Sequence, residues 1–251
     1  MMLKRWEELP KEMQNEDVRF YYDILTKKKY SLFLKRGFDI VVSVALLLIL
    51  CPFFLLLAIA IKVDSKGPVF YRQFRVTQYG KQFRIFKFRT MVQNADKIGT
   101  QVTVKQDARI TRVGKFIREY RLDETSQLLD VFRGTMSFVG TRPEVQKYVE
   151  QYTPEMWATL LLPAGITSTA SICYKEESKL LDGTRDIDRT YVEEILPQKM
   201  NYNLKDIEMF SFGRDIKIMF QTVFAVLGFA EKKKIRKMRG KGNERSIIEK
   251  N

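Results

Sequence analysis

One continuous apolar stretch, residues 40–61, dominates the pattern of apolar and polar positions along the chain. At about 1.5 Å per residue, an apolar helix of about 20 residues spans a hydrocarbon core of about 30 Å. Pro52, preceded by Cys51, lies at the centre of the stretch. Because proline removes a backbone donor and clashes with the preceding helical turn, we expect the helix to break there. Each half then reaches only about halfway across a bilayer.

Basic residues flank the apolar stretch on both sides. They are Lys27, Lys28, Lys29, Lys35 and Arg36 before it, and Lys62, Lys66, Arg72 and Arg75 after it. Because Lys and Arg favour the cytoplasmic side of a membrane, both ends of the helix are predicted on that side. A helix that enters the membrane, breaks at Pro52 and returns satisfies this rule. A kinked helix that spans the membrane once is the alternative, since proline is tolerated in transmembrane helices.

The segment after the apolar stretch has the pattern of a β-hairpin. Its predicted parts are a strand at 69–76, a turn at 78–80 and a returning strand at 82–88. The alternation of apolar and polar positions slips at Phe86, which predicts a β-bulge. Lys87 and Arg89 are expected on one face of the extended chain. That pair is either a solvated basic face or an anion-binding site.

Two helices are predicted next. Apolar residues repeat with helical spacing across 110–117, and cations occupy the opposite side. This helix either lies at a membrane interface or packs on the domain core. The second helix is expected to begin at Asp123, a favourable N-cap residue, and to end at Gly134. Residues 163–167 are expected to form a loop or an edge strand.

The chain divides into four predicted regions. They are an amphipathic surface segment at 1–34, a re-entrant membrane helix at 35–65, a cytoplasmic domain at 66–230 and a basic, disordered tail at 231–251. Residues 216–230 are apolar with the single charge of Lys217, which suits a helix lying on the membrane. The cations of the tail are expected to be attracted to anionic membrane lipid.

The charge balance and the absence of histidine restrict the chemistry. The 251 residues carry a net charge of +14, which indicates an anionic partner such as lipid, nucleic acid or a phosphorylated substrate. With no histidine in the chain, carboxylates must supply any acid, base or nucleophile. Cys51 and Cys173 are far apart in sequence, so neither a disulfide framework nor a cysteine metal site is indicated.

The pair Asp123 and Glu124, shortly after Arg118, is the sharpest candidate site. An Asp at the N-cap with a Glu in the first turn is also ordinary helix capping. The functional interpretation makes Asp123 a nucleophile and Glu124 a ligand of a divalent cation, near a helix N-terminus that favours phosphate. The local pattern alone leaves both interpretations open.

A series of motifs in fixed order resembles the bacterial sugar transferases, the monotopic polyprenyl-phosphate phosphoglycosyl transferases. The motifs are residues 35–39 (KRGFD), the broken apolar stretch, 65–73 (SKGPVFYRQ), 87–91 (KFRTM), 107–114 (DARITRVG), 122–128 (LDETSQL) and 134–143 (GTMSFVGTRP). The resemblance covers roughly residues 35–227.

This resemblance implies a fold that is mainly α with a short β-hairpin (α+β). It also implies a re-entrant helix broken at Cys51-Pro52, with interfacial amphipathic helices, on the cytoplasmic face of the bacterial inner membrane. The implied reaction moves a phosphosugar from a UDP-sugar to undecaprenyl phosphate with Mg²⁺, through a covalent aspartyl intermediate and with release of UMP. This is the first membrane step of capsule, exopolysaccharide, O-antigen or glycoprotein glycan synthesis.

The resemblance also implies roles for individual residues. Asp123 is the nucleophile and Glu124 the metal ligand of the implied catalytic pair. The residues expected to contact phosphate or substrate are Arg118, Arg142, Lys87, Arg89, Arg109, Asp188 and Tyr191. Those expected at the membrane interface are Lys35, Arg36 and Asp39.

Three departures from the family pattern bear on these expectations. The break is Cys51-Pro52 without a serine hydroxyl, Thr141 precedes Arg142 in place of proline, and the loop at 163–168 has an insertion and lacks a glycine. The identity of the sugar is therefore not inferred from the resemblance. A catalytically silent membrane scaffold on the same fold is the alternative function. Nucleic acid is not an expected partner, and a homo-oligomer is left open.

Overall fold

The structure is a computed structural model, and it describes residues 3–93, 95, 107–177 and 186–226. Its α-helices are α1 (Glu16–Thr26), α2 (Lys29–Asp64), α3 (Arg112–Glu119), α4 (Leu128–Arg133), α5 (Gln146–Val149), α6 (Thr169–Cys173), α8 (Ile187–Thr190), α9 (Leu196–Glu208) and α10 (Phe212–Val226). Its strands are β1 (Phe70–Val76), β2 (Gln82–Phe88), β3 (Met136–Val139) and β4 (Ala164–Thr167). Its 3₁₀ turns are η1 (Trp6–Glu8), η2 (Lys11–Met13), η3 (Gln78–Gly80), η5 (Leu122–Gln127) and η6 (Glu155–Leu160), and η7 (Tyr191–Ile195) is a π-helical turn.

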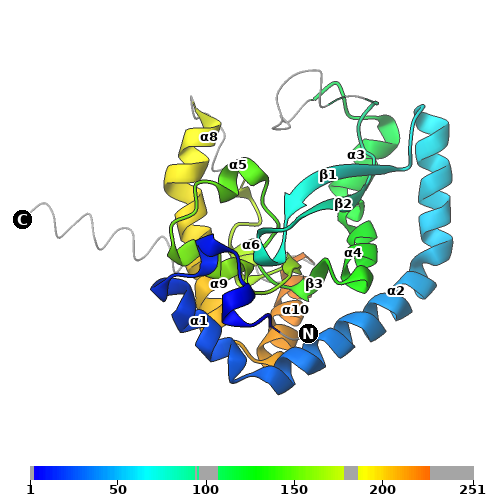
Figure 1. Cartoon of the computed structure of the whole chain (residues 1–251). Coiled ribbons are helices and arrows are strands. Elements are labelled where there is room, and N and C mark those ends of the chain that lie inside the picture. Colours follow the sequence, from blue (N-terminus) through cyan, green and yellow to red (C-terminus); the bar gives the residue numbers. More distant parts are fainter. Residues whose placement is uncertain (1–2, 94, 96–106, 178–185, 227–251) are drawn as a thin grey trace, which may run out of the picture.

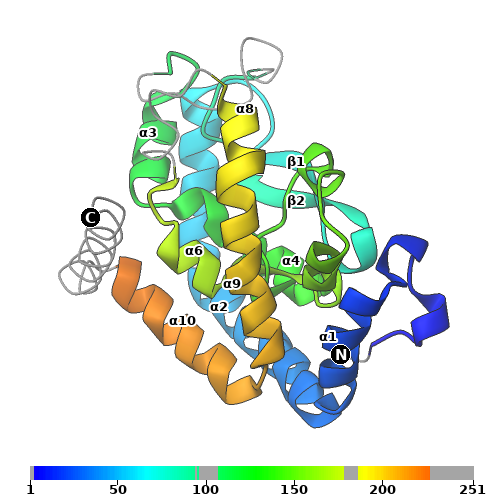
Figure 2. The same cartoon turned by 90° about the vertical axis from the view of Figure 1, so that its left-hand side faces the viewer.

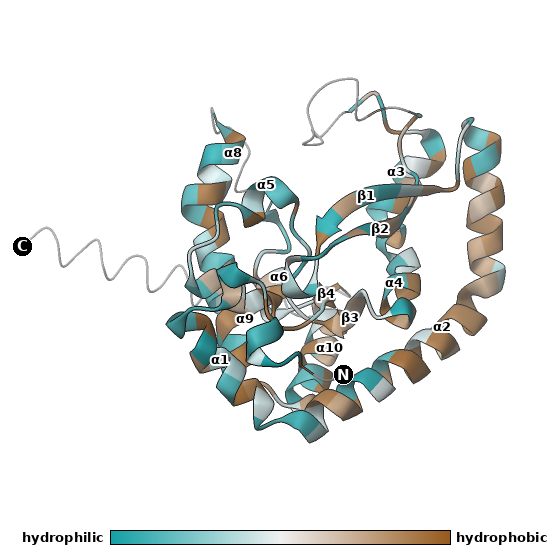
Figure 3. Cartoon of the chain, in the orientation of Figure 1, coloured by the Kyte–Doolittle hydropathy of each residue, from teal (hydrophilic) through white to brown (hydrophobic). Residues whose placement is uncertain are grey.

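Helix α2 holds the apolar stretch and is continuous through Pro52 over its 36 residues. The predicted break is therefore a bend within one helix, since proline removes only one donor from the hydrogen-bond ladder. Figure 1 shows α2 running beneath the domain and then turning up along its side. Among the described residues, α2 is the one helix long and apolar enough to cross a membrane. Figure 3 shows its second half as almost entirely hydrophobic.

The beginning of α2 is bonded to the domain by the residues expected at the membrane interface. Lys35 Nζ donates to Val139 O at 2.7 Å and forms an ion pair with Asp215. The Asp39 carboxylate accepts a hydrogen bond from the backbone N–H of Phe138 at 3.2 Å. Lys35 and Asp39 are only 3% and 1% exposed, so protein contacts surround both of them.

Arg36 binds the carboxyl end of α4. Its two terminal nitrogens donate to the carbonyl oxygens of Val131 and Phe132 at 2.7 and 2.8 Å. A cation at this position binds the last carbonyls of the helix and complements the helix dipole, in addition to the bond from Gly134 N to Val131 O at 3.1 Å.

The other end of α2 is bonded to the same domain. The Asp64 carboxylate accepts a hydrogen bond from Val113 N, at the start of α3, at 2.9 Å. Arg89, just after β2, donates to Ser65 O at 2.7 Å. The segments that enter and leave the apolar helix therefore both contact one folded domain.

Strands β1 and β2 form the predicted hairpin, paired one residue to one residue from Phe70 opposite Phe88 to Val76 opposite Gln82. The predicted bulge at Phe86 is wrong, because Phe86 pairs with Arg72 in the regular register. The alternation slips there because both faces of the strand are covered. Ile85 packs in the core, and the guanidinium groups of Arg72 and Arg133 cover the Phe86 ring.

Strands β3 and β4 form a short parallel pair. The prediction of an edge strand at 163–167 is confirmed by β4. Gly140 and Gly165 lie where these two segments meet, and a Cβ atom on either glycine would clash with the backbone of the opposite segment. This close approach fixes the path of the chain as it leaves β3 towards Arg142.

The N-terminal segment packs against the domain core. Met13, Val18 and Leu25 are fully buried there, in a cluster shared with residues of η6 and α9. Figure 2 shows α1 beside the start of α2. The expected surface helix at this position therefore has one deeply buried face, although Phe20 remains exposed.

Helices α3 and α10 each have an exposed apolar face. Ile117 is fully buried in a cluster with Leu57 and Ile61 of α2, so α3 packs on the core, while Phe116 stays exposed. In α10 the side chains of Phe220 and Phe224 are more than half exposed. The predicted tail at 231–251 and the end of the predicted helix at 216–230 lie outside the described residues.

Candidate active site

Asp123 and Glu124 lie in the 3₁₀ turn η5, directly before helix α4. The expectation that Asp123 caps a helix is wrong, because the N-cap of η5 is Arg121, whose backbone is left-handed with φ of 53°. A non-glycine residue in this conformation is uncommon and marks a sharp change of chain direction. Gly134, with φ of 83°, ends α4 as predicted. The Asp123 carboxylate is therefore free of a capping role.

The Glu124 carboxylate lies between two cations that come from different elements. Lys87 of β2 donates to its Oε1 at 3.2 Å, and Arg142, in the loop after β3, makes a two-pronged contact with both oxygens. Burial raises the pKa of Glu124, but Arg142 and Lys87 together hold it well below its usual value. Burial lowers the pKa of Lys87, and Glu124 opposes that change.

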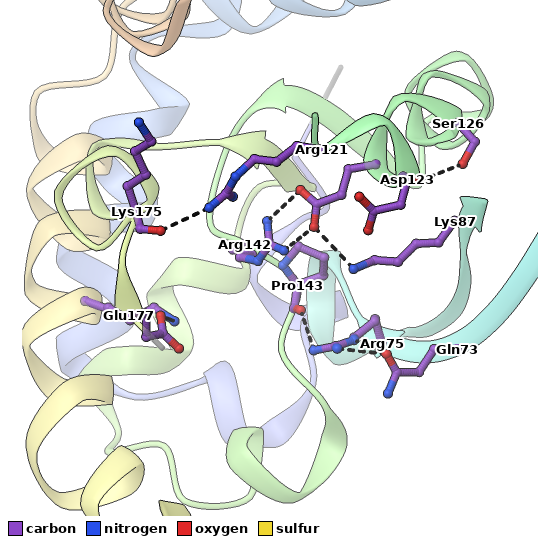
Figure 4. Close-up of polar contacts among 12 residues, drawn as sticks. Gln73, Arg75, Lys87, Arg121, Asp123, Ser126, Arg142, Pro143, Lys175 and Glu177 are labelled. Carbon is purple, nitrogen blue, oxygen red and sulfur yellow. Dashed lines mark hydrogen bonds and ion pairs between the residues drawn. The ribbon is translucent and has the colours of Figure 1, made fainter. Parts of the chain in front are cut away.

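The Asp123 carboxylate lies beside this cluster and is less tightly bound. Figure 4 shows Asp123 next to Lys87, on the turn that also carries Ser126. No side chain among the described residues donates a hydrogen bond to the Asp123 carboxylate, whereas its backbone oxygen accepts one from Ser126 at 3.3 Å. Burial and then the negative charge of Glu124 raise the pKa of Asp123. Asp123 is thus the carboxylate of the pair without an ion-pair partner among the described residues.

Arg75 supports the Arg142 loop and was missed as a site residue in the sequence. Its Nη1 donates to Pro143 O at 3.2 Å, and its side chain is held by Gln73 (Figure 4). In the hairpin register, Gln73 and Arg75 share a face with Lys87, so the two-residue period of β1 could have indicated them. Burial lowers the pKa of Arg75, and Glu144 opposes that change.

An open cavity of about 690 Å³ adjoins Glu124 and Arg142. Its apolar lining includes Leu46, Leu50, Phe138, Ile166, Ile172 and Val226, and its charged lining includes Arg121, Glu124, Arg142, Lys175, Glu177 and Lys199. Helix α2 therefore contributes Leu46 and Leu50 to the apolar part, and Glu124 of the carboxylate pair lies in the charged part. The sequence did not single out Arg121, Lys175, Glu177 or Lys199.

Arg121 and Lys175 connect this cavity to α10. Arg121 donates to the backbone oxygen of Lys175 at 3.1 Å, as Figure 4 shows. Lys175 in turn donates to Ala225 O, near the end of α10, at 2.9 Å. The two cations therefore line the cavity and also connect the segments that form its wall.

Three arginines expected to bind phosphate have internal partners. Arg118 donates to Thr90 Oγ1 at 2.8 Å, and burial lowers its pKa while the nearby Asp123 raises it. Arg109 pairs with Asp107 at 2.6 Å, and Arg89 binds the end of α2. Of these three, Arg118 is the one whose charge acts on Asp123.

Asp188 and Tyr191 lie on the far side of the Arg142 loop. Asp188 accepts hydrogen bonds from Lys147 at 2.8 Å and from Tyr148 at 2.7 Å, on the protein surface. Tyr191 is buried, and its hydroxyl donates to Glu144 at 2.6 Å. The structure therefore brings together Lys87, Asp123, Glu124 and Arg142, with the charge of Arg118 acting on Asp123. Asp188 and Tyr191 bind other partners.

The carboxylate pair can serve a divalent cation only with help from a substrate. Among the described residues, no three His, Cys, Asp or Glu side chains gather as a metal site. Two adjacent carboxylates nevertheless suit Mg²⁺, which commonly takes one or two carboxylates and completes its shell with water and substrate phosphates.

These features define a domain in which a partly buried carboxylate pair and several cations lie beside a helix long and apolar enough to cross a membrane. The chain belongs to the bacterial sugar transferase family, since the sequence model of that family matches residues 30–229. This result confirms the resemblance found in the motifs.

Named relatives agree with this assignment. The chain is 36% identical over 199 residues to the UDP-N-acetylgalactosamine-undecaprenyl-phosphate N-acetylgalactosaminephosphotransferase of Aeromonas hydrophila, which covers 78% of this chain and 44% of the relative. It is 38% identical over 203 residues to the UDP-glucose:undecaprenyl-phosphate glucose-1-phosphate transferase of Escherichia coli, with 79% and 41% covered. A protein of the same name from Caulobacter vibrioides is 35% identical over 196 residues, with 77% and 69% covered. The chain thus spans less than half the length of the first two relatives.

Proposed function

We propose that this chain transfers a phosphosugar from a UDP-sugar to undecaprenyl phosphate. The observation that carries the proposal is the single cavity that runs from Leu46 and Leu50 of α2 to Glu124 and Arg142. An acceptor with an apolar tail and a phosphate head needs such a site, apolar at the membrane and cationic at the reacting end. The names of the relatives, which act on undecaprenyl phosphate, support the same substrate class.

In the first step, an Asp123 carboxylate oxygen attacks the phosphorus that carries the sugar. A bond forms between this oxygen and phosphorus, the diphosphate bond breaks, and UMP leaves with the bonding electron pair. The raised pKa of Asp123 marks a carboxylate that is poorly solvated, and poor solvation favours its attack. Lys87 and Arg142, which lie beside the pair through their contacts with Glu124, would bind the diphosphate oxygens and stabilise the charge that develops on them.

In the second step, an oxygen of undecaprenyl phosphate attacks the same phosphorus. The bond from phosphorus to Asp123 breaks, which regenerates the carboxylate and yields the polyprenyl diphosphate sugar. Asp123 and Glu124 would hold Mg²⁺, which supplies positive charge that offsets the repulsion between phosphates and carboxylates. Glu124 would then share its oxygens between the ion, Lys87 and Arg142.

We also propose that α2 is re-entrant and that the domain lies on the cytoplasmic face of the inner membrane. The support is that Lys35, before the apolar stretch, and Asp64, after it, are both bonded to the same domain. A helix spanning the membrane once would separate those two contacts. The exposed apolar faces of α3 and α10 suit contact with the membrane surface, and the basic residues suit anionic lipid.

The test is UMP release by the purified protein in nanodiscs with Mg²⁺, undecaprenyl phosphate and a panel of UDP-sugars. Release with one donor, lost in Asp123→Ala, supports the reaction and the nucleophile. A catalytically silent scaffold would release no UMP with any donor. In that case the Asp123→Ala gene would still support glycan synthesis in cells that lack the native gene, whereas the proposed transferase would not.

A further inference from the structure

Lys199 of α9 lies in a buried polar cluster that takes no part in the steps described above. The side chain is 5% exposed, and its neighbours Tyr191 and Glu144 are 4% and 6% exposed. Lys199 Nζ lies 3.2 Å from Glu144 Oε1, 2.8 Å from the Tyr191 hydroxyl and 2.9 Å from Glu177 Oε2. Two of the three ammonium donors are thus hydrogen-bonded, and Glu177 adds an ion pair.

The internal partners of Lys199 suit it to holding protein groups in place rather than binding substrate. A cation that binds substrate phosphate needs an accessible donor, whereas three protein oxygens lie around the buried Lys199 ammonium. Burying an ammonium group is costly unless it is paired, so such a cluster is retained where it holds other groups in place. The groups it holds are Glu144, two residues after Arg142, and Glu177, on the cavity wall.

Glu144 anchors the loop that carries Arg142 to neighbouring elements. Its carboxylate binds Tyr191 at 2.6 Å as well as Lys199, and its backbone oxygen accepts from Val76 N at 2.9 Å. The preceding carbonyl, of Pro143, accepts from Arg75. Arg142 therefore extends from a loop held on both sides, and its guanidinium meets Glu124.

Lys199 also joins the Arg142 loop to the cavity wall. Its ammonium lies 3.2 Å from the Glu144 carboxylate and 2.9 Å from the Glu177 carboxylate, so one cation connects the two segments.

We propose that Lys199 is a positioning residue for donor binding. Through Glu144 it fixes the loop that carries Arg142, so that the guanidinium meets the diphosphate of the UDP-sugar. This inference rests on the function proposed above, because it gives Arg142 the role of contacting the donor. Lys199 itself touches no reacting atom.

The test compares Lys199→Met with the double variant Lys199→Met/Glu144→Gln, in full-length protein in nanodiscs. The double variant removes the unpaired buried charge that the single variant leaves behind, so it should recover thermal stability. We expect the KM for the UDP-sugar to rise on the order of 10-fold or more in both variants, since a hydrogen bond to a charged group is worth about that factor. The kcat should fall as well, because Arg142 also stabilises the charge that develops on the diphosphate during the reaction.

UDP alone serves as a binding probe that does not depend on turnover. Its dissociation constant should rise in parallel with KM, and Lys199→Arg should recover part of the loss. Lys205→Met is the matched control, since Lys205 is an exposed lysine on the same helix. The inference is overturned if the double variant binds UDP with wild-type affinity. Failure of the wild-type protein to bind UDP or to release UMP would instead overturn the proposed function.

Tyr191→Phe provides an independent variant if Lys199→Met fails to fold. It removes the hydroxyl that joins Lys199 to Glu144 while leaving both charges in place. The same weakening of UDP binding is expected. Unchanged UDP affinity in a folded Tyr191→Phe protein would count against the inference.

Discussion

The ammonium of Lys35 and the carboxylate of Asp215 form a buried ion pair at 2.6 Å, which joins the membrane helix α2 to α10. Lys35 also donates to Val139 O, at the end of β3. Since Arg142 follows β3 by three residues, the same side chain that anchors the apolar helix also fixes the strand leading to the site. The position of α2 and the path of the chain towards Arg142 are thus coupled through one cation.

Replacing Asp215 with Asn should strongly destabilise the protein. The substitution removes the carboxylate bonded to the buried Lys35 ammonium and leaves Asp39 as the nearby counter-charge. Breaking one partner of a buried pair typically costs about 3–5 kcal/mol, and Asp39 offsets part of that cost. Thermal or urea unfolding in detergent measures the loss. Lys217→Gln is the matched control on the same helix, because Lys217 is exposed, and it should leave stability nearly unchanged. Equal stability of Asp215→Asn and wild type would show that the pair contributes nothing.

Local patterns in the sequence predicted the elements that depend on neighbouring residues. The two-residue period gave the hairpin strands, and Gly134 marked the end of α4, because each depends on nearby backbone conformation. The bulge at Phe86 was wrong because Arg72 and Arg133 cover a face that the pattern treated as open. The break expected at Pro52 is a bend within a continuous helix.

The parts of the site that depend on tertiary contacts were less accessible to the sequence. Motif resemblance gave Lys87, Asp123, Glu124 and Arg142, which the structure brings together. Lys199 was missed, although it occupies the buried face of α9 among apolar residues, which is an unusual place for a lysine. The lysine within the apolar face of α9 could therefore have been noticed in the sequence. Its partners Glu144, Tyr191 and Glu177 could not have been predicted, because tertiary contacts bring them together.

Asp123→Asn should abolish turnover while preserving the fold. The amide cannot form the bond to phosphorus, and loss of a nucleophile typically costs on the order of 10³-fold or more in kcat. UMP release measures this effect. Glu119→Gln removes an exposed carboxylate a few residues earlier in the chain and should keep wild-type activity. Substantial UMP release by Asp123→Asn would assign the nucleophile to another group.

Glu124 should make stability depend on pH in a defined direction. Although burial raises its pKa, Arg142 and Lys87 lower it below the usual 4.5 in the folded state. A group with a depressed folded pKa stabilises the fold above its unfolded pKa, and this contribution is lost as the pH falls through the folded pKa. Wild type should therefore exceed Glu124→Gln in melting temperature at pH 7, and the difference should shrink below pH 4.5.

The comparison of wild type with Glu124→Gln needs a control variant in which a carboxylate away from the site is replaced by an amide. Glu119→Gln supplies it, because Glu119 has an exposed side chain. Its melting temperature should follow wild type at every pH. A difference between wild type and Glu124→Gln that stays constant down to pH 3 would contradict the assigned ion pairs.

Removal of divalent cations should stop UMP release. EDTA is expected to abolish activity, and added Mg²⁺ should restore it, because the site has two carboxylates that repel a diphosphate. Glu124→Gln should need a higher Mg²⁺ concentration for half-maximal rate. Activity that persists in excess EDTA would remove Mg²⁺ from the proposal.

The topology of α2 can be tested with single cysteines at Phe20 and Lys66, which lie on either side of the apolar stretch and are exposed. In a Cys51→Ser/Cys173→Ala background, a membrane-impermeant maleimide should label neither site in intact cells and both after permeabilisation. The physical reason is that Lys35 and Asp64 contact one domain, so a straight span would have to break one set of contacts. Labelling of one site alone in intact cells would establish the single kinked span. Pro52→Leu should favour that arrangement, because it restores the missing helix bond, and should therefore reduce both stability and UMP release.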